Sequence, residues 1–275
     1  MKKQSLPEDT IEVTTYRELT SHLEAFKRKI GEEKQKQIWI VGPAGTGKSR
    51  IVKKSLSEIP HFFVSGSATS AKLYEELFRY RDLPVVFDDL SSVYRNRELM
   101  SMLRNLCDTD EVKVIHRIKM RKDNDPLPDS FSTKSPVIII TNQIEIKKTL
   151  ALCSRFTVLH FNPSVTDILN SAEGWFKDEE IKDFIEDLLP YVKRLNFRKL
   201  NRMSEFKEEG IRDWRTEGAR MLGLKPNIVL MIQLLSKPFS SKGDRIREFN
   251  RLSTSDWYST WDRLPLGLKQ TYACP

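Results

Sequence analysis

The sequence contains no long hydrophobic run. No apolar stretch among its 275 residues approaches the roughly 18 residues that a membrane-spanning helix needs, so we expect no membrane span. The first residues, MKKQSLPEDTIEV, include lysines but lack the apolar segment of a secretory signal. We therefore expect a cytoplasmic protein that has no membrane partner.

Cysteine is scarce as well. The three cysteines, Cys107, Cys153 and Cys274, are odd in number and show neither a pairing pattern nor the spacing of a metal site. This pattern favours a reducing compartment over a secreted protein that is held together by disulfides.

Apolar and charged residues, in contrast, are plentiful. Hydrophobic residues make up 39% of the chain, which is enough to fill a core, and charged residues make up 31%. The net charge of +8 allows contact with nucleic acid or another polyanion. Many soluble proteins are equally basic, so the charge alone does not identify a partner.

Strand and helix patterns alternate between residues 37 and 163. Short apolar runs predict strands, and longer segments with apolar residues at helical spacing predict helices. This alternation indicates an α/β fold with a largely parallel sheet. The predicted strands cover residues 37–41, 61–65, 84–89, 135–142 and 156–161, and residues 111–120 predict a further strand or hairpin arm.

Helical patterns lie on both sides of this region. Thr15 and Glu18 have the spacing of a capping box, so we expect a helix to begin there. After Pro163 the pattern becomes helical, and Gly210 and Gly223 are expected helix ends. Residues 227–236 fit either a helix or a buried strand. The expected division is an N-terminal helix and linker (1–36), an α/β domain (37–163), a small helical domain (164–225) and a C-terminal extension (226–275).

The most specific motif follows the first strand of the α/β domain. Residues 42–49 read GPAGTGKS and match the Walker A pattern G-x-x-x-x-G-K-[ST] at every fixed position. The glycines let the backbone approach an anion, and N–H groups of the loop and of the next helix would bind phosphates. Lys48 would contact the β- and γ-phosphates, and Ser49 would ligate Mg²⁺. The strand before the loop and the helix after it argue against a chance match. The predicted nucleotide-binding residues are Gly42, Pro43, Ala44, Gly45, Thr46, Gly47, Lys48, Ser49 and Arg50.

Two adjacent acids end the strand VVFDD. Asp88 would hold the water shell of a magnesium ion, and Asp89 could polarise an attacking water if hydrolysis occurs. The alternative is that both acids simply end a strand and begin a turn. Their position after an unbroken apolar strand favours the functional interpretation.

Two further polar residues follow strand or helix ends. Asn142 ends the apolar strand SPVIIITN, where its amide could position a water molecule without adding charge beside phosphate. Arg155 ends a helix and could reach the γ-phosphate bound by a neighbouring subunit, where it would stabilise transition-state charge. Asparagine commonly ends strands, and the alternative for Arg155 is a surface salt bridge.

In this order, the motifs resemble those of the AAA+ family of ATPases. The resemblance covers residues 14–222 and implies a parallel five-stranded sheet in the order 5-1-4-3-2, a helical lid, and a homo-oligomeric ring or filament with ATP between subunits. It gives Asn142 the sensor-1 position and Arg155, in the sequence SRF, the arginine-finger position. The segment LNFRKLNRM resembles the start of the sensor-2 helix, which implies a γ-phosphate contact from Arg198, with Arg202 as the second choice. The compact layout is similar to that of ATPases from phages and mobile elements.

One position departs from the family pattern. Most members carry Asp-Glu at the end of the Walker B strand, whereas this chain carries Asp88 and Asp89. The shorter Asp89 side chain holds its carboxylate further from the water, so hydrolysis could be slow.

A basic segment precedes the Asn142 strand. Apolar and basic residues alternate there, which suggests a hairpin with one basic face. Such a face would bind nucleic-acid phosphates without reading sequence, or it could be an exposed, solvated hairpin. The basic residues are Lys113, Arg117, Lys119, Arg121 and Lys122.

Three functions fit these observations. The first is an ATPase, with ATP and Mg²⁺, that acts on DNA in replication, recombination or transposition. The second is a protein-remodelling chaperone, although the segment SGSATSAKLYEEL lacks the expected aromatic-hydrophobic-Gly pore triplet. The third is an ATP-dependent assembly switch with weak or no hydrolysis.

Overall fold

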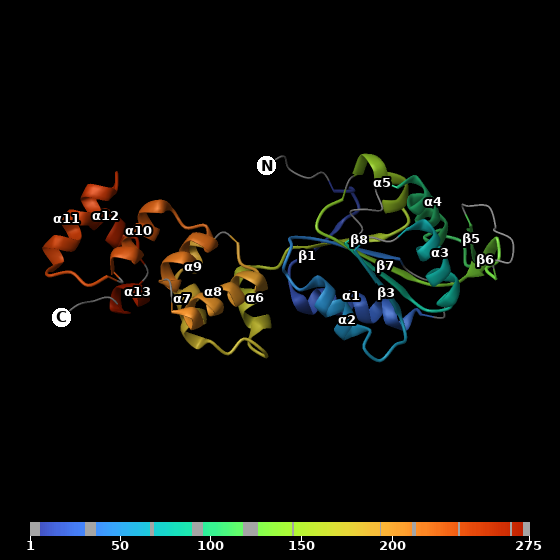
Figure 1. The fold of residues 1–275 in the computed structure, drawn as a ribbon, viewed down its shortest axis with the longest axis horizontal. Coiled ribbons are helices and arrows are strands. Elements are labelled where there is room, and N and C mark those ends of the chain that lie inside the picture. The colour runs from blue at the N-terminus through green and yellow to red at the C-terminus, as the bar shows by residue number, and fades with distance from the viewer. Residues whose placement is uncertain are drawn as a thin grey trace. The chain divides into compact units, whose positions relative to one another are not determined.

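The structure, a computed structural model, describes residues 6–30, 37–66, 69–89, 96–117, 126–144, 146–192, 194–210, 213–235, 237–264 and 266–271. The chain forms two compact units, residues 1–163 and residues 164–275, and each is described by itself (Figure 1). No helix within the described ranges is long and apolar enough to cross a membrane.

A parallel sheet forms the centre of the first unit. Its order is β1-β8-β2-β7-β4-β3, and every neighbouring pair is parallel. This confirms the predicted α/β class. The strands are β1 (Ile11–Val13), β2 (Ile38–Val41), β3 (Phe62–Ser65), β4 (Val85–Asp88), β7 (Val137–Thr141) and β8 (Thr157–Phe161).

The predicted number and order of strands were wrong. The sheet has six strands because β1 adds beyond β8, with Ile11 opposite Leu159 and Val13 opposite Phe161. The three residues of β1, one of them charged, are too few to show a strand pattern in the sequence. The strand forms because its backbone pairs with the free edge of β8. Without β1, the remaining five strands follow the relative order that the AAA+ resemblance implies.

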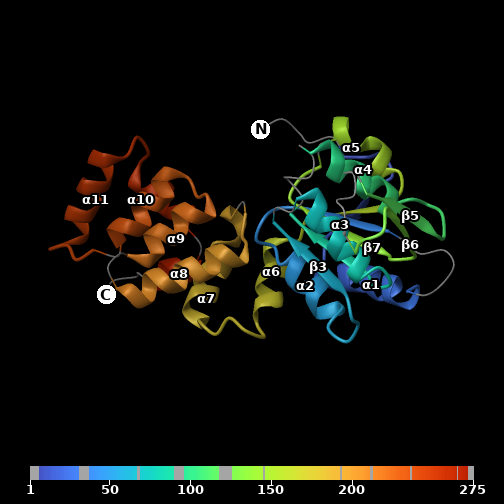
Figure 2. The same ribbon diagram turned by 45° about the vertical axis from the view of Figure 1, so that its right-hand side comes forward.

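Helices cover both faces of this sheet, which explains why the strands are apolar at successive positions. In β2, Ile38 and Ile40 pack on one side with α1 and α2, whereas Trp39 and Val41 pack on the other with α3, α4 and α5. Figures 1 and 2 show these two helical layers. The helices are α1 (Tyr16–Arg28), α2 (Lys48–Ser55), α3 (Ser70–Arg79), α4 (Arg97–Leu106) and α5 (Ile146–Cys153).

A separate antiparallel hairpin joins β5 (Lys113–His116) to β6 (Ser130–Thr133). Its inward side chains Ile115 and Phe131 enter the same core cluster as α3 and α4. The predicted hairpin is therefore confirmed. Residues 118–125, between its strands, lie outside the described ranges.

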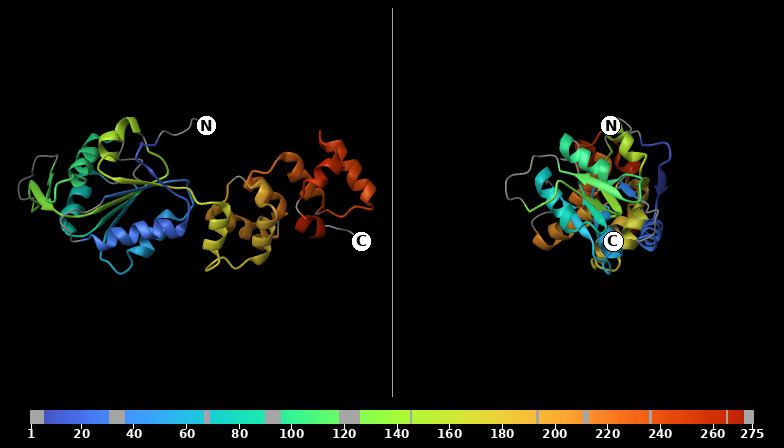
Figure 3. Two further views of the ribbon diagram at one scale, coloured as in Figure 1. Left: turned by 180° about the vertical axis from the view of Figure 1, so that it is seen from behind. Right: turned by 90° about the vertical axis from the view of Figure 1, so that its right-hand side faces the viewer.

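The described residues of the second unit form helices joined by turns and loops, with no strand among them (Figure 3). Gly210 and Gly223 end α8 and α9 with left-handed φ angles of 59° and 81°, as predicted. Residues 226–235 form a helix, which decides between the two earlier alternatives. The elements are α6 (Val165–Ala172), α7 (Glu179–Asp187), the 3-10 turn η2 (Leu189–Tyr191), α8 (Phe197–Glu209), α9 (Trp214–Leu222), α10 (Pro226–Leu235), α11 (Lys242–Leu252), α12 (Trp257–Asp262) and α13 (Leu266–Thr271).

Candidate nucleotide-binding site

Three of the predicted site residues lie at one edge of the sheet. Carboxyl ends of parallel strands share an edge, and ligands of open α/β sheets bind outside it. Gly42 follows β2, Asn142 follows β7, and Asp88 ends β4, and these three strands are direct neighbours in the order β2-β7-β4. The strand register aligns Val41 with Thr141, one residue before Gly42 and Asn142.

The loop between β2 and α2 has a conformation that requires glycine. Gly45 and Gly47 have φ angles of 77° and 83°, in the left-handed region that side chains disfavour. Gly42 is required for space, because a Cβ there would lie 2.0 Å from the carbonyl oxygen of Phe161. The loop therefore passes directly against the end of β8 before it enters α2.

Lys48 is the central cation of this loop. Its side chain is buried, and its Nζ donates to the carbonyl oxygens of Gly42 and Pro43, both at 2.8 Å. It also donates to Oδ1 of Asn142 at 3.2 Å, which brings together two predicted residues 94 positions apart. These three partners are carbonyl and amide oxygens, which carry no net charge.

The strands under this contact are joined by a bond that sequence reasoning missed. Trp39 in β2 donates from Nε1 to Oγ1 of Thr141 at 2.9 Å, and both side chains are buried. Thr141 directly precedes Asn142. The bond therefore fixes the end of β7 relative to β2, and no local signal in the sequence indicates a pair 102 positions apart.

The two acids differ in backbone conformation. Asp88 is half-buried at the end of β4, and Asp89 is exposed, with a φ angle of 58° and its N–H donating to the Ile140 carbonyl at 3.0 Å. Among residues other than glycine, aspartate and asparagine tolerate a left-handed φ best. This gives a physical reason for aspartate, rather than glutamate, at position 89.

The oxygen ligands fit a magnesium ion that is bound together with phosphate. No group of three or more His, Cys, Asp or Glu side chains within the described ranges could hold a metal by itself. Mg²⁺ commonly takes one or two protein oxygens and completes its shell with phosphate and water. Ser49, half-buried in the first turn of α2, and Asp88 are the two residues of suitable chemistry.

The predicted arginines have different surroundings. Arg155 donates to the Arg104 carbonyl at 2.6 Å, in the last turn of α4, and lies 3.9 Å from the Asp108 carboxylate. Arg155 is thus bonded within its own chain, which fits the alternative of a surface salt bridge. In the second unit, Arg198 is exposed in the first turn of α8, whereas Arg202 is paired with Glu205 at 2.6 Å.

The predicted place of Lys113 on a basic face of the hairpin was wrong. Lys113 points inward, with 3% of its surface exposed, and donates to the Ser135 carbonyl at 2.6 Å, whereas Val114 is 44% exposed. The strand alternation that takes Ile115 into the core takes Lys113 inward with it. Burial lowers the pKa of Lys113 from its ordinary value to about 8.

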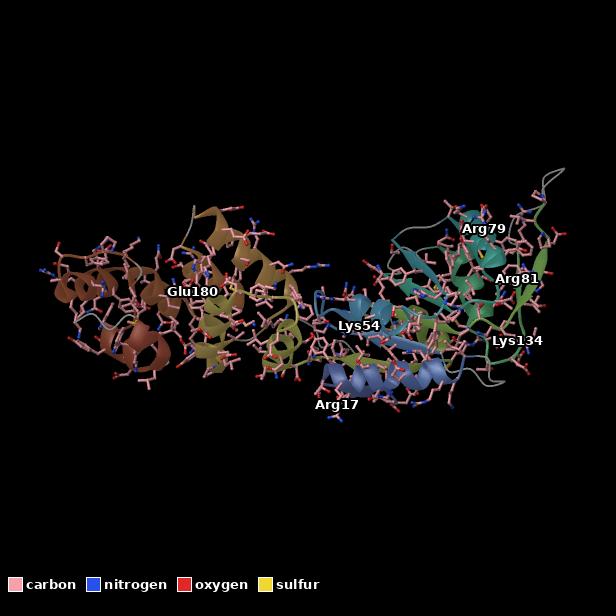
Figure 4. The ribbon with its side chains drawn as sticks, turned by 90° about the horizontal axis from the view of Figure 1, so that it is seen from below. Arg17, Lys54, Arg79, Arg81, Lys134 and Glu180 are labelled. Carbon is pink, nitrogen blue, oxygen red and sulfur yellow. The ribbon has the colours of Figure 1, made fainter. Side chains whose placement is uncertain are left out.

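Of the other predicted basic residues of the hairpin, the structure describes Arg117 alone. Arg117 is half-buried and its backbone N–H donates to the Asp129 carbonyl at 2.8 Å. In neighbouring segments, Arg79 at the end of α3 is paired with Glu75, and Lys134, which follows β6, is paired with Glu111; Figure 4 labels both basic residues. Three further predicted DNA contacts lie outside the described ranges: Lys119, Arg121 and Lys122.

The fold and the site together have the architecture of a P-loop unit. A glycine-containing loop leads from a central parallel strand into a helix, a lysine lies inside the loop, and an acid ends a nearby strand. No protein-family model matches the chain, and no curated protein matches its sequence.

Solved structures give distant matches. Three single-residue variants of RuvB from Thermotoga maritima are 13%, 14% and 14% identical to the chain, with TM-scores of 0.46, 0.46 and 0.47. The matches cover 93%, 94% and 94% of this chain and 85%, 86% and 88% of those chains. All three TM-scores lie below 0.5, so the similarity is distant.

Proposed function

We propose that the chain is a P-loop ATPase of the AAA+ type that binds Mg²⁺–ATP at the loop Gly42–Ser49. The observation that carries this proposal is the position of Lys48. Its ammonium lies inside a loop in which Gly45 and Gly47 have left-handed φ angles. It also lies beside Asn142, at the carboxyl edge of the sheet. Nucleotide phosphates would replace the Gly42 and Pro43 carbonyls as partners of this ammonium.

The surrounding residues have complementary roles in this proposal. Loop N–H groups and the start of α2 hold the phosphates, and Ser49 and Asp88 hold the magnesium ion, which neutralises phosphate charge. Asp89 accepts a proton from the attacking water, and Asn142 orients that water. Arg155 of a neighbouring subunit stabilises the charge that develops on the γ-phosphate, and the sensor-2 contact of Arg198 remains a prediction.

Phosphate release in Lys48→Ala tests the proposal. The parent chain should release phosphate from ATP in the presence of Mg²⁺, and Lys48→Ala should lose this activity. Lys54→Ala is the matched control, because Lys54 is an exposed lysine on the same helix α2 (Figure 4). This variant should hydrolyse ATP at the parental rate. Parental turnover in Lys48→Ala would remove the P-loop from the reaction.

An ATP-dependent assembly switch is the second candidate function. It is favoured by the short, left-handed Asp89 at the position of the catalytic base. In a switch, ATP would stay bound and control oligomer assembly while turning over slowly. Measuring oligomer mass with ATP and with ADP, alongside the hydrolysis rate, distinguishes a switch from a motor.

We further propose that the chain acts on DNA as a ring or filament, with the compact layout of ATPases from phages or mobile elements. This proposal has a separate test. ATPase activity is measured alone and with single-stranded or double-stranded DNA near 50 mM salt. Stimulation that weakens steeply with added salt would indicate phosphate contacts. If the chain binds no nucleic acid under these conditions, the DNA role fails and a protein partner replaces it.

A further inference from the structure

The P-loop is held from outside by a residue of the N-terminal helix. Tyr16, the first residue of α1, donates from its hydroxyl to the Thr46 carbonyl at 2.9 Å. Its ring packs edge-on against Phe161 of β8, with centroids 5.1 Å apart. The Walker A motif contains neither partner ring, and the contact joins residues 30 positions apart.

This bond has a geometric consequence for the next amide. Carbonyl and N–H groups of one trans peptide plane point in opposite directions. Holding the Thr46 carbonyl toward Tyr16 therefore turns the Gly47 N–H away from Tyr16. Gly47 has a φ angle of 83°, a conformation from which a glycine escapes at low cost unless its neighbours are fixed. The tyrosine hydroxyl thus sets the direction of one of the loop donors.

The same side chain also supports the first residue of the loop. The Phe161 carbonyl lies directly against Gly42, so closely that a Cβ at Gly42 would be 2.0 Å from it. The Tyr16 ring packs on Phe161, and the Tyr16 hydroxyl binds Thr46. One residue therefore contacts the loop itself at Thr46 and the strand end that lies against Gly42.

Hydrogen bonds of neighbouring residues hold the backbone at Tyr16 in place. Thr15 caps α1, because Glu18 N–H donates to Thr15 Oγ1 at 3.1 Å and Thr15 N–H donates to Glu18 Oε2 at 3.2 Å. Before this cap, β1 pairs with β8, and the Asn162 N–H donates to the Val13 carbonyl at 3.0 Å. The sixth strand and the capping box therefore fix Tyr16 to the part of the sheet that borders the loop.

We propose that Tyr16 is a positioning residue for phosphate binding, and that β1 and the start of α1 form a clamp on the P-loop. This inference rests on the proposed nucleotide site. Because the Tyr16 bond orients a donor without touching the nucleotide, its loss should weaken the grip on phosphates and leave the fold intact.

Tyr16→Phe tests the clamp, since it removes the hydroxyl and keeps the ring against Phe161. A single hydrogen bond contributes about 1 kcal/mol, so the affinities for ADP and ATP should both fall by roughly three- to tenfold. The matched control is Tyr74→Phe, because the Tyr74 hydroxyl donates to the Pro128 carbonyl at 2.7 Å in the same unit. That variant should keep parental nucleotide affinity even if its unfolding temperature falls.

Hydrogen exchange supplies a readout that a merely stabilising residue would not change. Without nucleotide, peptides that cover residues 42–50 should exchange faster in Tyr16→Phe, while peptides from β4 and β7 should keep parental rates. Should Tyr16→Phe fail to fold, Glu18→Ala takes its place. This variant loosens the first turn of α1 without substituting a residue of the loop, and residues 42–50 should again exchange faster.

The outcomes separate the clamp from the nucleotide site. If the parent binds ADP, Lys48→Ala does not, and Tyr16→Phe keeps parental affinity, the clamp is wrong and the proposed function stands. Equal losses of affinity in Tyr16→Phe and Tyr74→Phe also overturn the clamp, because they show a general stability effect. If the parent binds neither ADP nor ATP, both proposals fail.

Discussion

At the residue scale, the loop glycines are required for two different reasons. Gly45 and Gly47 supply left-handed backbone, whereas Gly42 supplies room for the Phe161 carbonyl. The second reason is more severe, because a new Cβ at Gly42 would meet backbone, which cannot rotate away.

A pair of alanine substitutions tests this difference. Gly42→Ala should lower the free energy of unfolding by about 1–3 kcal/mol and abolish nucleotide binding, because β8 and the loop must separate. Gly218→Ala in α9 is the control: its Cβ would lie 2.7 Å from Met203 Sδ, which belongs to a flexible side chain that can move. Part of that cost is offset by alanine's higher helix propensity. Chemical denaturation measures both changes, and equal destabilisation would contradict the proposed clash.

Asp89 combines an unusual backbone with a proposed catalytic role. Asp89→Asn should retain ATP but slow its hydrolysis, because an amide cannot accept the proton, while asparagine tolerates the left-handed backbone. Asp89→Glu introduces the acid that most AAA+ members carry at this position. It should be less stable than Asp89→Asn, because glutamate tolerates the left-handed backbone less well. Single-turnover hydrolysis and thermal unfolding measure the two effects. Normal turnover in Asp89→Asn would exclude Asp89 as the base.

At the element scale, the hairpin contains a buried cation whose ionisation should be visible in stability. The Lys113 pKa is about 8 in the folded chain, against an ordinary value of 10.5. Between these values the unfolded chain holds the proton and the folded chain does not, so raising the pH favours folding.

Lys113→Met tests this effect. The free energy of unfolding of the parent, relative to Lys113→Met, should rise by about 2 kcal/mol between pH 7 and pH 10. Urea denaturation at several pH values measures the difference, and using the variant as reference cancels the titration of other groups. A difference that is constant with pH would show that Lys113 keeps an ordinary pKa in the folded chain.

Local signals were enough to predict most elements but not all. The capping box of Thr15 and Glu18 and the glycine ends of α8 and α9 depend on neighbouring residues, and the structure contains them. By contrast, β1 depends on the edge of β8, about 150 positions away. The inward direction of Lys113 depends on a core that its own alternating pattern does not specify.

At the scale of the whole molecule, the same limit applies to the site. From the sequence, Asp88 and Asn142 were predicted to act beside phosphates bound by the loop that begins at Gly42, because each residue ends a strand. It could not predict the contact of Lys48 with Asn142, the Trp39–Thr141 bond or the Tyr16 clamp. Each of these joins distant segments, and no local pattern records such a pair.

The proposed trans role of Arg155 belongs to an assembly of several chains. Arg155→Ala and Lys48→Ala chains should each be inactive, and mixed assemblies should regain part of the ATPase activity, because some interfaces pair an intact loop with an intact arginine. Arg155→Lys is a control for folding, since lysine can still donate to the Arg104 carbonyl. No recovery in assemblies shown to be mixed would favour a purely structural role beside Asp108.

Direct titration of Mg²⁺–ATP into the parent and Lys48→Ala tests the central claim, that Lys48 and the glycine loop bind nucleotide phosphates. The parent should bind one ATP per chain, and the variant should bind at least about tenfold more weakly, because it loses a charge-assisted hydrogen bond. Its unfolding should be compared with that of Lys54→Ala, to show that the loss is local. Undiminished ATP affinity in folded Lys48→Ala, or no binding by the parent, would contradict the claim.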